Sequence, residues 1–301
     1  MVTVGVCVKN CEDTVKDAVR SIISQDFSHE LMEVIVVDGC SSDRTVKKIK
    51  DVINHSNIKY RIFSEDKGLG YARQIVVDNA LGDFIIWVDG DMVLPKNFVT
   101  KQISFMKNNP DVGIGRAKYG VLPEQKYVAF LENIPFVVES WRHEGDVPLS
   151  ICGTEGAIYR VCAIKEVGGF DINMRGAGED TDLARRILDA GWLAKSTDAI
   201  FYEQCKESWM DLWKQYSWWG YGGHYIYHKT KDFGMPFKIS PLGGFLAGIL
   251  RFPFAYKLTA RKILFLLPFH YAFKRLAFCY GFTKAHIKGY GHHADVKKTG
   301  E

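Results

Sequence analysis

The first half of the chain alternates between short continuous apolar runs and segments in which apolar residues recur every three or four positions. Continuous runs are typical of strands buried on both faces of a parallel sheet. The spaced pattern is typical of helices with one face in the core. The expected strands are residues 2–8, 34–37, 58–63 and 84–88, and helices follow the first three near Val15, Val46 and Ala72. This alternation predicts a doubly wound, mostly parallel α/β sheet.

Polar loops follow three of the four predicted strands. They contain Asn10 and Glu12, then residues 38–43, then Asp89 and Asp91. The carboxyl ends of parallel strands lie along one edge of a sheet, where ligands bind in open α/β folds. We therefore expect a nucleotide to lie along this edge.

Asp89 and Asp91 follow directly on the apolar run 84–88 and are separated by one glycine. Two adjacent carboxylates repel each other and lose hydration there, so they imply a bound cation. Hard oxygen ligands in a short loop suit Mg²⁺ or Mn²⁺. An isolated Asp-x-Asp is more often a solvated turn, and it is the other polar strand ends that favour a metal site here.

Other residues of this edge have chemistry suited to a nucleotide. Asp38 can accept hydrogen bonds from a base or a ribose. Gly68 and Gly70 allow the backbone to approach a ligand, and Arg73 offers a planar cation nearby. Taken alone, Asp38-Gly39 is also a common turn, the two glycines are a weak phosphate motif, and Arg73 is better explained as a surface residue, so the signal is their combination.

Taken in order, these segments resemble glycosyltransferase family 2. The resemblance rests on Asn10 and Glu12, on Asp-Gly-Cys-Ser-Ser-Asp-Arg-Thr at 38–45, on Gly-Tyr-Ala-Arg at 70–73 and on Asp-Gly-Asp at 89–91, and it extends over residues 2–228. It implies the GT-A fold, a nucleotide pocket that uses Asp38 and Arg73, and a metal–diphosphate site at Asp89 and Asp91. One departure is Cys11, where the family often has glutamate. We assign donor binding to Val8, Asn10, Glu12, Asp38, Gly68, Arg73 and Asp89, and metal binding to Asp91 and Asp89.

Two later segments are candidates for the acceptor side. In residues 150–160, a small-residue stretch with Gly153 and Thr154 would let a sugar pack against backbone. Glu179 and Asp180 open a predicted helix, where acids also complement the helix dipole and cap free N–H groups. Their distance from the Asp-x-Asp resembles the position of the catalytic base in the family. The resemblance implies Asp180 as base and Glu179 as its neighbour or an acceptor-binding residue, and the two roles can be exchanged.

Residues 209–228 form an aromatic segment with helical spacing. Aromatic faces commonly stack on sugar rings, although a Trp-rich helix is more often part of a core or an interface. The segment resembles the family's aromatic run near the diphosphate or the acceptor. It makes Gln215, Trp218 and Trp219 candidates for acceptor binding.

His224 and His228 lie at i, i+4 spacing in the same segment, on one helical face that can bind a metal. We expect a simple polar face. The alternative is that one of the two histidines completes the metal site of Asp91. His292 and His293, near the end of the chain, are expected to have no metal role.

Composition places the chain among ordinary globular proteins, with 301 residues of which 47% are hydrophobic and 25% charged. Its seven cysteines show no paired spacing, which indicates neither a disulfide framework nor a zinc site and favours a cytosolic compartment. Charge is uneven. Residues 229–301 hold thirteen Lys and Arg against three Asp and Glu, giving +10, and residues 1–228 hold 26 against 32, giving −6. The basic end predicts an anionic partner for that end, other than nucleic acid.

In residues 229–301, single Lys or Arg residues, or pairs of them, interrupt the apolar runs. No run reaches the ~20 residues that a membrane-spanning helix needs. Aromatics beside spaced cations describe helices that lie in a membrane interface and are attracted to anionic lipids. A helical subdomain packed on the catalytic body, or a short hairpin with snorkelling cations, is the alternative. We expect a catalytic domain over 1–230 and a membrane-interface tail over 231–301. The expected location is the cytoplasm, peripherally attached to the cytoplasmic face of a membrane.

The resemblance implies an inverting, metal-dependent hexosyltransferase that uses a nucleotide-diphosphate sugar. The tail predicts a lipid-linked glycan acceptor. One alternative is transfer to a polyprenyl phosphate, as in enzymes that resemble dolichyl-phosphate mannose synthase, and Glu179 and Asp180 argue against it because a phosphate needs no base. A nucleotidyltransferase would carry a Gly-rich basic loop after the first strand, which Lys9 to Glu12 is not. A non-catalytic membrane-associated scaffold is the remaining alternative.

Overall fold

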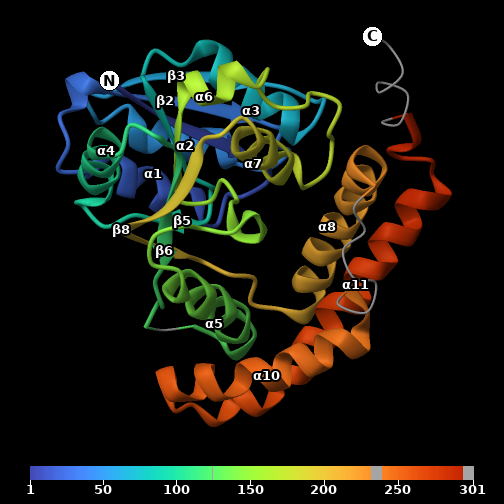
Figure 1. Ribbon diagram of the computed structural model, residues 1–301. Helices are drawn as coiled ribbons and strands as arrows, with labels where there is room; N and C mark the ends of the chain where they lie inside the picture. The colour runs from blue at the N-terminus through green and yellow to red at the C-terminus, as the bar shows by residue number, and fades with distance from the viewer. Residues whose placement is uncertain (124, 232–238, 294–301) are drawn as a thin grey trace. The chain divides into compact units, whose positions relative to one another are not determined.

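The computed structural model of the protein describes residues 1–123, 125–231 and 239–293. They form two compact units (Figure 1). Unit 1 comprises Met1–Leu122, Glu139–Arg175 and Glu179–Gln204, and unit 2 comprises Pro123–Val138, Gly176–Gly178 and the described part of Cys205–Glu301.

Unit 1 is built on an eight-stranded sheet with the order β3-β2-β1-β4-β7-β6-β8-β5. The strands are β1 Val2–Val8, β2 Met32–Asp38, β3 Lys59–Ser64, β4 Phe84–Trp87, β5 Met92–Val93, β6 Val112–Tyr119, β7 Ala157–Arg160 and β8 Leu193–Glu203. Strands β1 to β4 are parallel, and β7 runs antiparallel between β4 and β6. The α/β fold class predicted from the sequence is confirmed, as a mixed sheet.

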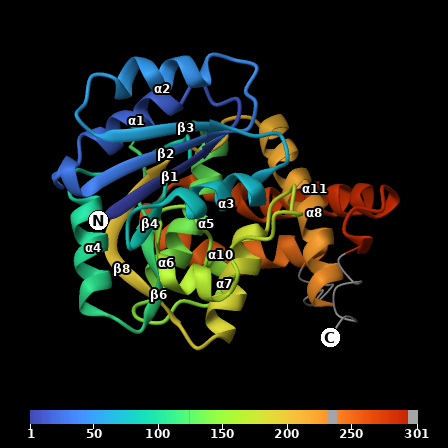
Figure 2. The same cartoon turned by 90° about the horizontal axis from the view of Figure 1, so that it is seen from above.

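The helices of unit 1 cover both faces of this sheet. They are α1 Val15–Ile23, α2 Thr45–Ile53, α3 Leu69–Asn79, α4 Phe98–Asn108, α6 Val161–Glu166 and α7 Glu179–Asp189, with short 3₁₀ turns η1 His29–Leu31 and η2 Leu149–Ile151. Figure 2 shows α1 and α2 on one face and α3, α6 and α7 on the other. On the α3 side Trp87 is fully buried, and its ring contacts Phe170 edge-on at 5.4 Å. Gly5 of β1 leaves the room for this ring, because a Cβ there would lie 2.9 Å from Trp87.

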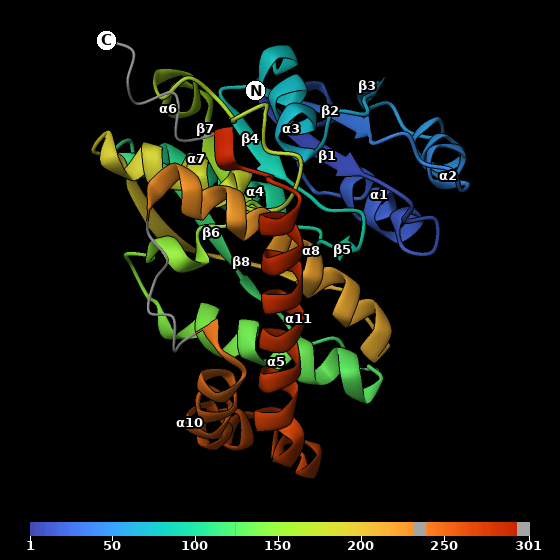
Figure 3. The same cartoon turned by 90° about the vertical axis from the view of Figure 1, so that its right-hand side faces the viewer.

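Unit 2 is helical. It contains α5 Tyr127–Arg142 as far as Val138, then α8 Trp209–Thr230, α10 Pro241–Thr259, the 3₁₀ turn η3 Lys262–Leu266 and α11 Leu267–Ile287. Figure 3 shows α11 alongside α8 and against α10. The α8–α11 crossing needs glycine on both helices, because a Cβ at Gly220 would meet the Phe278 carbonyl and one at Gly281 would meet the Ser217 carbonyl.

A buried polar network ties three of these helices together. Glu132 of α5 accepts hydrogen bonds from Lys274 Nζ at 2.8 Å and from the Tyr216 hydroxyl at 2.7 Å. His270 Nε2 lies 3.3 Å from the same carboxylate. All four side chains are buried, and the hydrogen bonds to Glu132 replace the water that the Lys274 ammonium and the Tyr216 hydroxyl lose in a helical core.

Helix α10 has an unusual division of its faces. Its buried positions are small residues, Gly243, Gly244, Gly248 and Ala255. Its large apolar side chains are exposed, at Leu242, Leu246, Ile249, Leu250, Phe254 and Leu258. Among the described residues, no helix combines the length and the apolar content that crossing a bilayer requires.

The sequence predicted a catalytic domain that ends at residue 230 and a membrane-interface tail after it, and this functional division stays a prediction. The compact units divide differently, because α8 belongs with the C-terminal helices from Cys205 onward. Of the predicted tail, residues 232–238 and 294–301 lie outside the described residues.

Candidate active site

The loops after β1 and β2 are tied together by side chains that the sequence assigned to donor binding. Asn10, which has a φ of 49°, accepts a hydrogen bond from the Ser42 N–H at 2.8 Å. Glu12 forms an ion pair with Arg44 at 2.8 Å, which lowers the pKa of Glu12. Both residues therefore hold the shape of the edge at which Val8 and Asp38 end their strands.

Asp38 presents an acceptor with no hydrogen-bond partner. Its side chain is buried, and Oδ2 accepts from the Ser41 N–H at 2.9 Å. Oδ1 is also buried and has no partner within the described residues. A buried acceptor without a donor is costly, so an N–H or O–H of a ligand would be favourable here. This is the chemistry that a base or ribose supplies.

Gly68 and Gly70 approach the chain's own backbone. Gly68 has a φ of 116°, and a Cβ there would lie 2.6 Å from the Arg175 Cα. Gly70 donates its N–H to the Met174 carbonyl at 3.1 Å, and a Cβ there would meet the Asp171 carbonyl. Positions 68 and 70 must therefore be glycine because segment 171–175 packs directly against them. The ligand contact assigned to Gly68 stays a prediction.

Arg73 lies at the centre of a carboxylate cluster rather than on the surface. Its guanidinium is hydrogen-bonded to Glu179 Oε1, and it lies 3.9 Å from Asp180 Oδ2 and 3.9 Å from Asp89 Oδ1. Arg73 comes from α3, Asp89 follows β4, and the two other acids open α7. The structure therefore brings two of the predicted donor-binding residues, Arg73 and Asp89, into one group with the predicted catalytic pair.

The charges of this group do not balance. Loss of hydration raises the pKa of Glu179 to about 8 against the opposing effect of Arg73. Loss of hydration and the carboxylates of Asp91, Glu155 and Asp180 likewise raise the pKa of Asp89 to about 7, although 38% of its side chain is exposed. The carboxylates of Glu179, Asp180 and Asp89 surround the Arg73 guanidinium, and those of Asp91 and Glu155 act on Asp89 beside them. Such a set must hold protons or bind a cation, and its hard oxygens fit Mg²⁺ or Mn²⁺.

Glu155 belongs to this group, and sequence reasoning missed it. Its Oε1 lies 2.8 Å from Arg116 Nη2 and accepts from the Tyr119 hydroxyl at 3.0 Å. A Cβ at Gly153 would meet the Glu155 carboxylate, and the buried hydroxyl of Thr154 has no partner within the described residues. One sequence signal could have pointed to Glu155. Arg116 lies in the middle of the buried strand β6, and a buried cation needs an acidic partner.

The predicted acceptor residues of α8 lie in unit 2. Trp218 is 41% exposed, and Trp219 packs on Tyr216 with ring centroids 4.6 Å apart. The buried Oε1 of Gln215 has no partner within the described residues. Their role in acceptor binding, like that of Gly153 and Thr154, stays a prediction.

His224 and His228 also lie in unit 2, where their side chains gather with those of His286 and His292. A simple polar face does not describe this arrangement, because four imidazoles converge. A contribution of either histidine to the Asp91 site stays a prediction.

Sequence comparison identifies the framework around this site. The sequence profile described as Glycosyl transferase family 2 matches residues 3–168, more than half of the chain. The chain belongs to glycosyltransferase family 2. Among its relatives, it is 25% identical over 240 residues to the probable glycosyltransferase YdaM of Bacillus subtilis and 24% identical over 247 residues to the poly-beta-1,6-N-acetyl-D-glucosamine synthase of Staphylococcus epidermidis. These alignments cover 75% and 77% of the chain but 56% of each relative, so the chain spans about half the length of the curated relatives it matches.

Solved structures share the fold of this family member. The mannosyltransferase PcManGT of Pyrobaculum calidifontis, in complex with GDP-Man and Mn²⁺, superposes with a TM-score of 0.58 at 17% identity, covering all of this chain and 76% of that one. S. aureus TarS 1–349 in complex with UDP-GlcNAc superposes with a TM-score of 0.54 at 16% identity, covering 96% and 92%. These likenesses show the GT-A fold.

Proposed function

We propose that the protein transfers a hexose from a nucleotide-diphosphate sugar to a hydroxyl group of a lipid-linked glycan, with inversion and with Mg²⁺ or Mn²⁺. The observation that carries this proposal is the group of three carboxylates around Arg73, with Asp91 and Glu155 acting on one of them, at the carboxyl edge of a family 2 sheet. These acids repel one another, and a protein that only served as a binding scaffold would gain nothing to offset that repulsion. An enzyme that binds a metal–diphosphate needs such acids to hold the metal.

The donor would lie along the carboxyl ends of β1, β2 and β4. Asp38 would accept from the base or ribose through its unpartnered Oδ1. Asp89 and Asp91 would hold the metal, which when bound supplies positive charge to the departing diphosphate. Related proteins support this class of donor, since TarS was solved with UDP-GlcNAc and PcManGT with GDP-Man and Mn²⁺.

Asp180 would take the proton of the acceptor hydroxyl as it attacks the anomeric carbon. Its side chain is 20% exposed, whereas that of Glu179 is buried at 1% and bonded to Arg73. Asp180 is the more accessible of the two acids and lies farther from the Arg73 guanidinium, so it is the better placed to reach an acceptor. The ion pair of Glu179 would instead fix the first turn of α7 and hold Asp180 in place.

A lipid-linked acceptor is supported by α10. Small residues face its neighbour α11, and large apolar residues face outward. A soluble helix normally has the reverse arrangement, whereas small residues between helices are common where the outer faces contact lipid. Lys257, an exposed cation near the end of α10, would contact anionic headgroups beside this apolar face. We infer attachment to the cytoplasmic face of a membrane.

The test is hydrolysis and transfer with a panel of nucleotide sugars, with and without Mn²⁺, by the wild-type protein and the Asp91→Asn variant. Asp83→Asn is the matched control, because Asp83 precedes the same strand at its opposite end and its side chain is 80% exposed. We expect metal-dependent turnover of one donor, lost in Asp91→Asn and retained in Asp83→Asn. Failure of the wild-type protein to bind or turn over any donor would overturn the proposal.

A further inference from the structure

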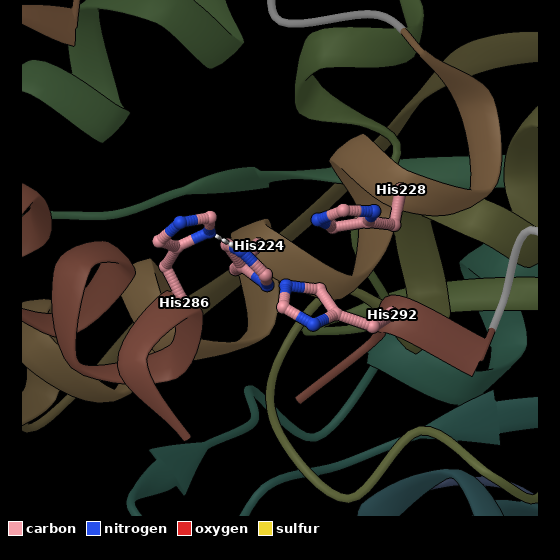
Figure 4. Close-up of side chains that lie close together, drawn as sticks. All are labelled: His224, His228, His286 and His292. Atoms are coloured by element: carbon pink, nitrogen blue, oxygen red, sulfur yellow. Dashed lines mark hydrogen bonds between the residues drawn. The ribbon is translucent and has the colours of Figure 1, made fainter. Parts of the chain in front are cut away.

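Four imidazoles converge in unit 2 (Figure 4). His224 and His228 come from α8, His286 from the last turn of α11, and His292 from the turn that follows. One ring nitrogen from each lies within 4.8 Å of the others. His224 Nε2 and His286 Nδ1 are 3.2 Å apart.

The buried member, His224, has its ring orientation fixed by the backbone. Its Nδ1 lies 2.5 Å from the carbonyl oxygen of Tyr290, which can only accept, so Nδ1 carries the hydrogen. Nε2 is then left with a lone pair directed at His286. Metal-binding histidines usually show this arrangement, in which the second ring nitrogen donates to a carbonyl or carboxylate.

The turn that delivers His292 is built to do so. Gly289 and Gly291 both have positive φ, and a Cβ at Gly291 would lie 2.7 Å from the Tyr225 Cα of α8. Between them, Tyr290 stacks on Tyr221 of α8 with ring centroids 4.6 Å apart. Contacts with α8 therefore fix the turn without help from an ion. His292 is placed 4.7 Å from His228, centroid to centroid.

We propose that His224, His228, His286 and His292 form a transition-metal site whose best-matched ion is Zn²⁺. Four neutral nitrogen donors suit a tetrahedral ion, and Zn–N bonds of about 2.0–2.1 Å place neighbouring ligand nitrogens about 3.3 Å apart. The His224–His286 separation already has this value, and small rotations of the exposed His286 and His292 would close the others. Exposure of these two rings also gives the ion a path from solvent.

This site differs in chemistry from the acidic cluster of unit 1. Imidazole nitrogens favour zinc, copper and nickel, whereas carboxylates favour magnesium and manganese. Two of its ligands belong to α8 and two follow or end α11, so a bound ion would fasten the C-terminal turn of the described chain to α8. We assign it a structural role that is independent of the proposed transfer reaction.

Zinc binding by the full-length protein, prepared without an affinity tag and stripped of metal, tests this proposal. Zn²⁺ is titrated against a chromophoric chelator, and Co²⁺ replaces it to record the visible bands of tetrahedral coordination. We expect one equivalent per chain and a tetrahedral Co²⁺ spectrum. The variant His292→Ala, and separately His228→Ala, should weaken Zn²⁺ at least about tenfold, since even loss of an outer partner costs that much.

His293→Ala is the matched control, because His293 is adjacent to His292, exposed and outside the cluster. Its affinity for Zn²⁺ should equal that of the wild type, as should that of Asp91→Asn. Far-UV circular dichroism confirms that each variant is folded. The proposal is overturned if the wild type binds no Zn²⁺ at micromolar concentration, if His292→Ala binds as tightly, or if Asp91→Asn abolishes binding. None of these results bears on turnover of nucleotide sugars.

Discussion

Arg73 and Glu179 form a buried ion pair between positions that are 106 residues apart in the chain. It joins α3 to the first turn of α7, so it couples the sheet edge that is predicted to bind the nucleotide to the predicted catalytic base. Burial alone would lower the pKa of Arg73, but the surrounding carboxylates raise it, so the guanidinium stays charged. The pair is therefore a structural link, and its guanidinium offsets the charge of the buried Glu179 carboxylate.

Removing the guanidinium should destabilise unit 1 and abolish activity. Arg73→Met keeps much of the side-chain volume but leaves Glu179 buried without its partner, which costs about 3–5 kcal/mol for buried pairs. Urea denaturation measures this change. Arg20→Met is the control, because Arg20 is 58% exposed beside Asp17 and should lose less than about 0.5 kcal/mol. Equal stability of the two variants would contradict a structural role for the pair.

Asp180→Asn should separate the two acceptor chemistries. If Asp180 removes the proton of an acceptor hydroxyl, kcat should fall about 10²–10⁴-fold while donor affinity is retained. Donor affinity is measured by calorimetry and kcat by a transfer assay. An unchanged kcat would instead point to a phosphate acceptor, which is already ionised and needs no base. Thr181→Val is the comparison, since it removes only the hydroxyl that donates to Asp180 Oδ1 at 3.3 Å and should lower kcat far less than Asp180→Asn.

The first four strands and their polar loops could be predicted from sequence because both signals are local. Apolar runs mark β1 to β4, and the rule that ligands bind at carboxyl ends places Asp38 and Asp89 on one edge. The pairing of Arg73 with Glu179 could not be predicted, because it depends on how segments 106 residues apart pack in three dimensions. Glu155 was missed for the same reason.

The histidine cluster shows the same limit. The i, i+4 spacing of His224 and His228 was readable from the sequence, but His292 reaches them only because the chain reverses after α11. That reversal depends on positive φ at Gly289 and Gly291 and on contacts with α8. Local sequence indicates that a turn is possible there. It does not indicate against which helix the turn packs.

Glu132 should give unit 2 an acid-sensitive stability. Burial opposes ionisation of Glu132, but Lys274 and His270 outweigh it and lower the pKa from 4.5 to about 2. A lowered pKa contributes stability that is present above pH 4.5 and is lost as pH falls toward 2. The shift corresponds to about 3 kcal/mol. Glu132→Gln should therefore be less stable at pH 7 and show a flatter dependence between pH 4.5 and 2.

Urea denaturation at a series of pH values measures this effect. Glu207→Gln is the control, because Glu207 forms an exposed pair with Lys126 in the same unit at 2.6 Å. An exposed pair contributes about 0–1 kcal/mol, so this variant should follow the wild-type pH profile. A Glu132→Gln profile that matches the wild type would show that the buried network does not govern acid stability.

The outward face of α10 should bind anionic membranes. Leu250 is 72% exposed and Phe254 is 55% exposed, and insertion of each into the interface would contribute about 1.5–3 kcal/mol. Replacing both with glutamate removes this term and adds repulsion from the headgroups. Binding to vesicles that contain phosphatidylserine, measured by co-sedimentation, should fall at least about a hundredfold.

Leu81→Glu with Ile172→Glu is the control, because both residues are exposed apolar side chains of unit 1 and should leave vesicle binding unchanged. Two results would contradict lipid binding: wild-type protein that stays in the supernatant, or an equal loss of vesicle binding in both double variants. Either would assign the apolar face of α10 to a protein partner.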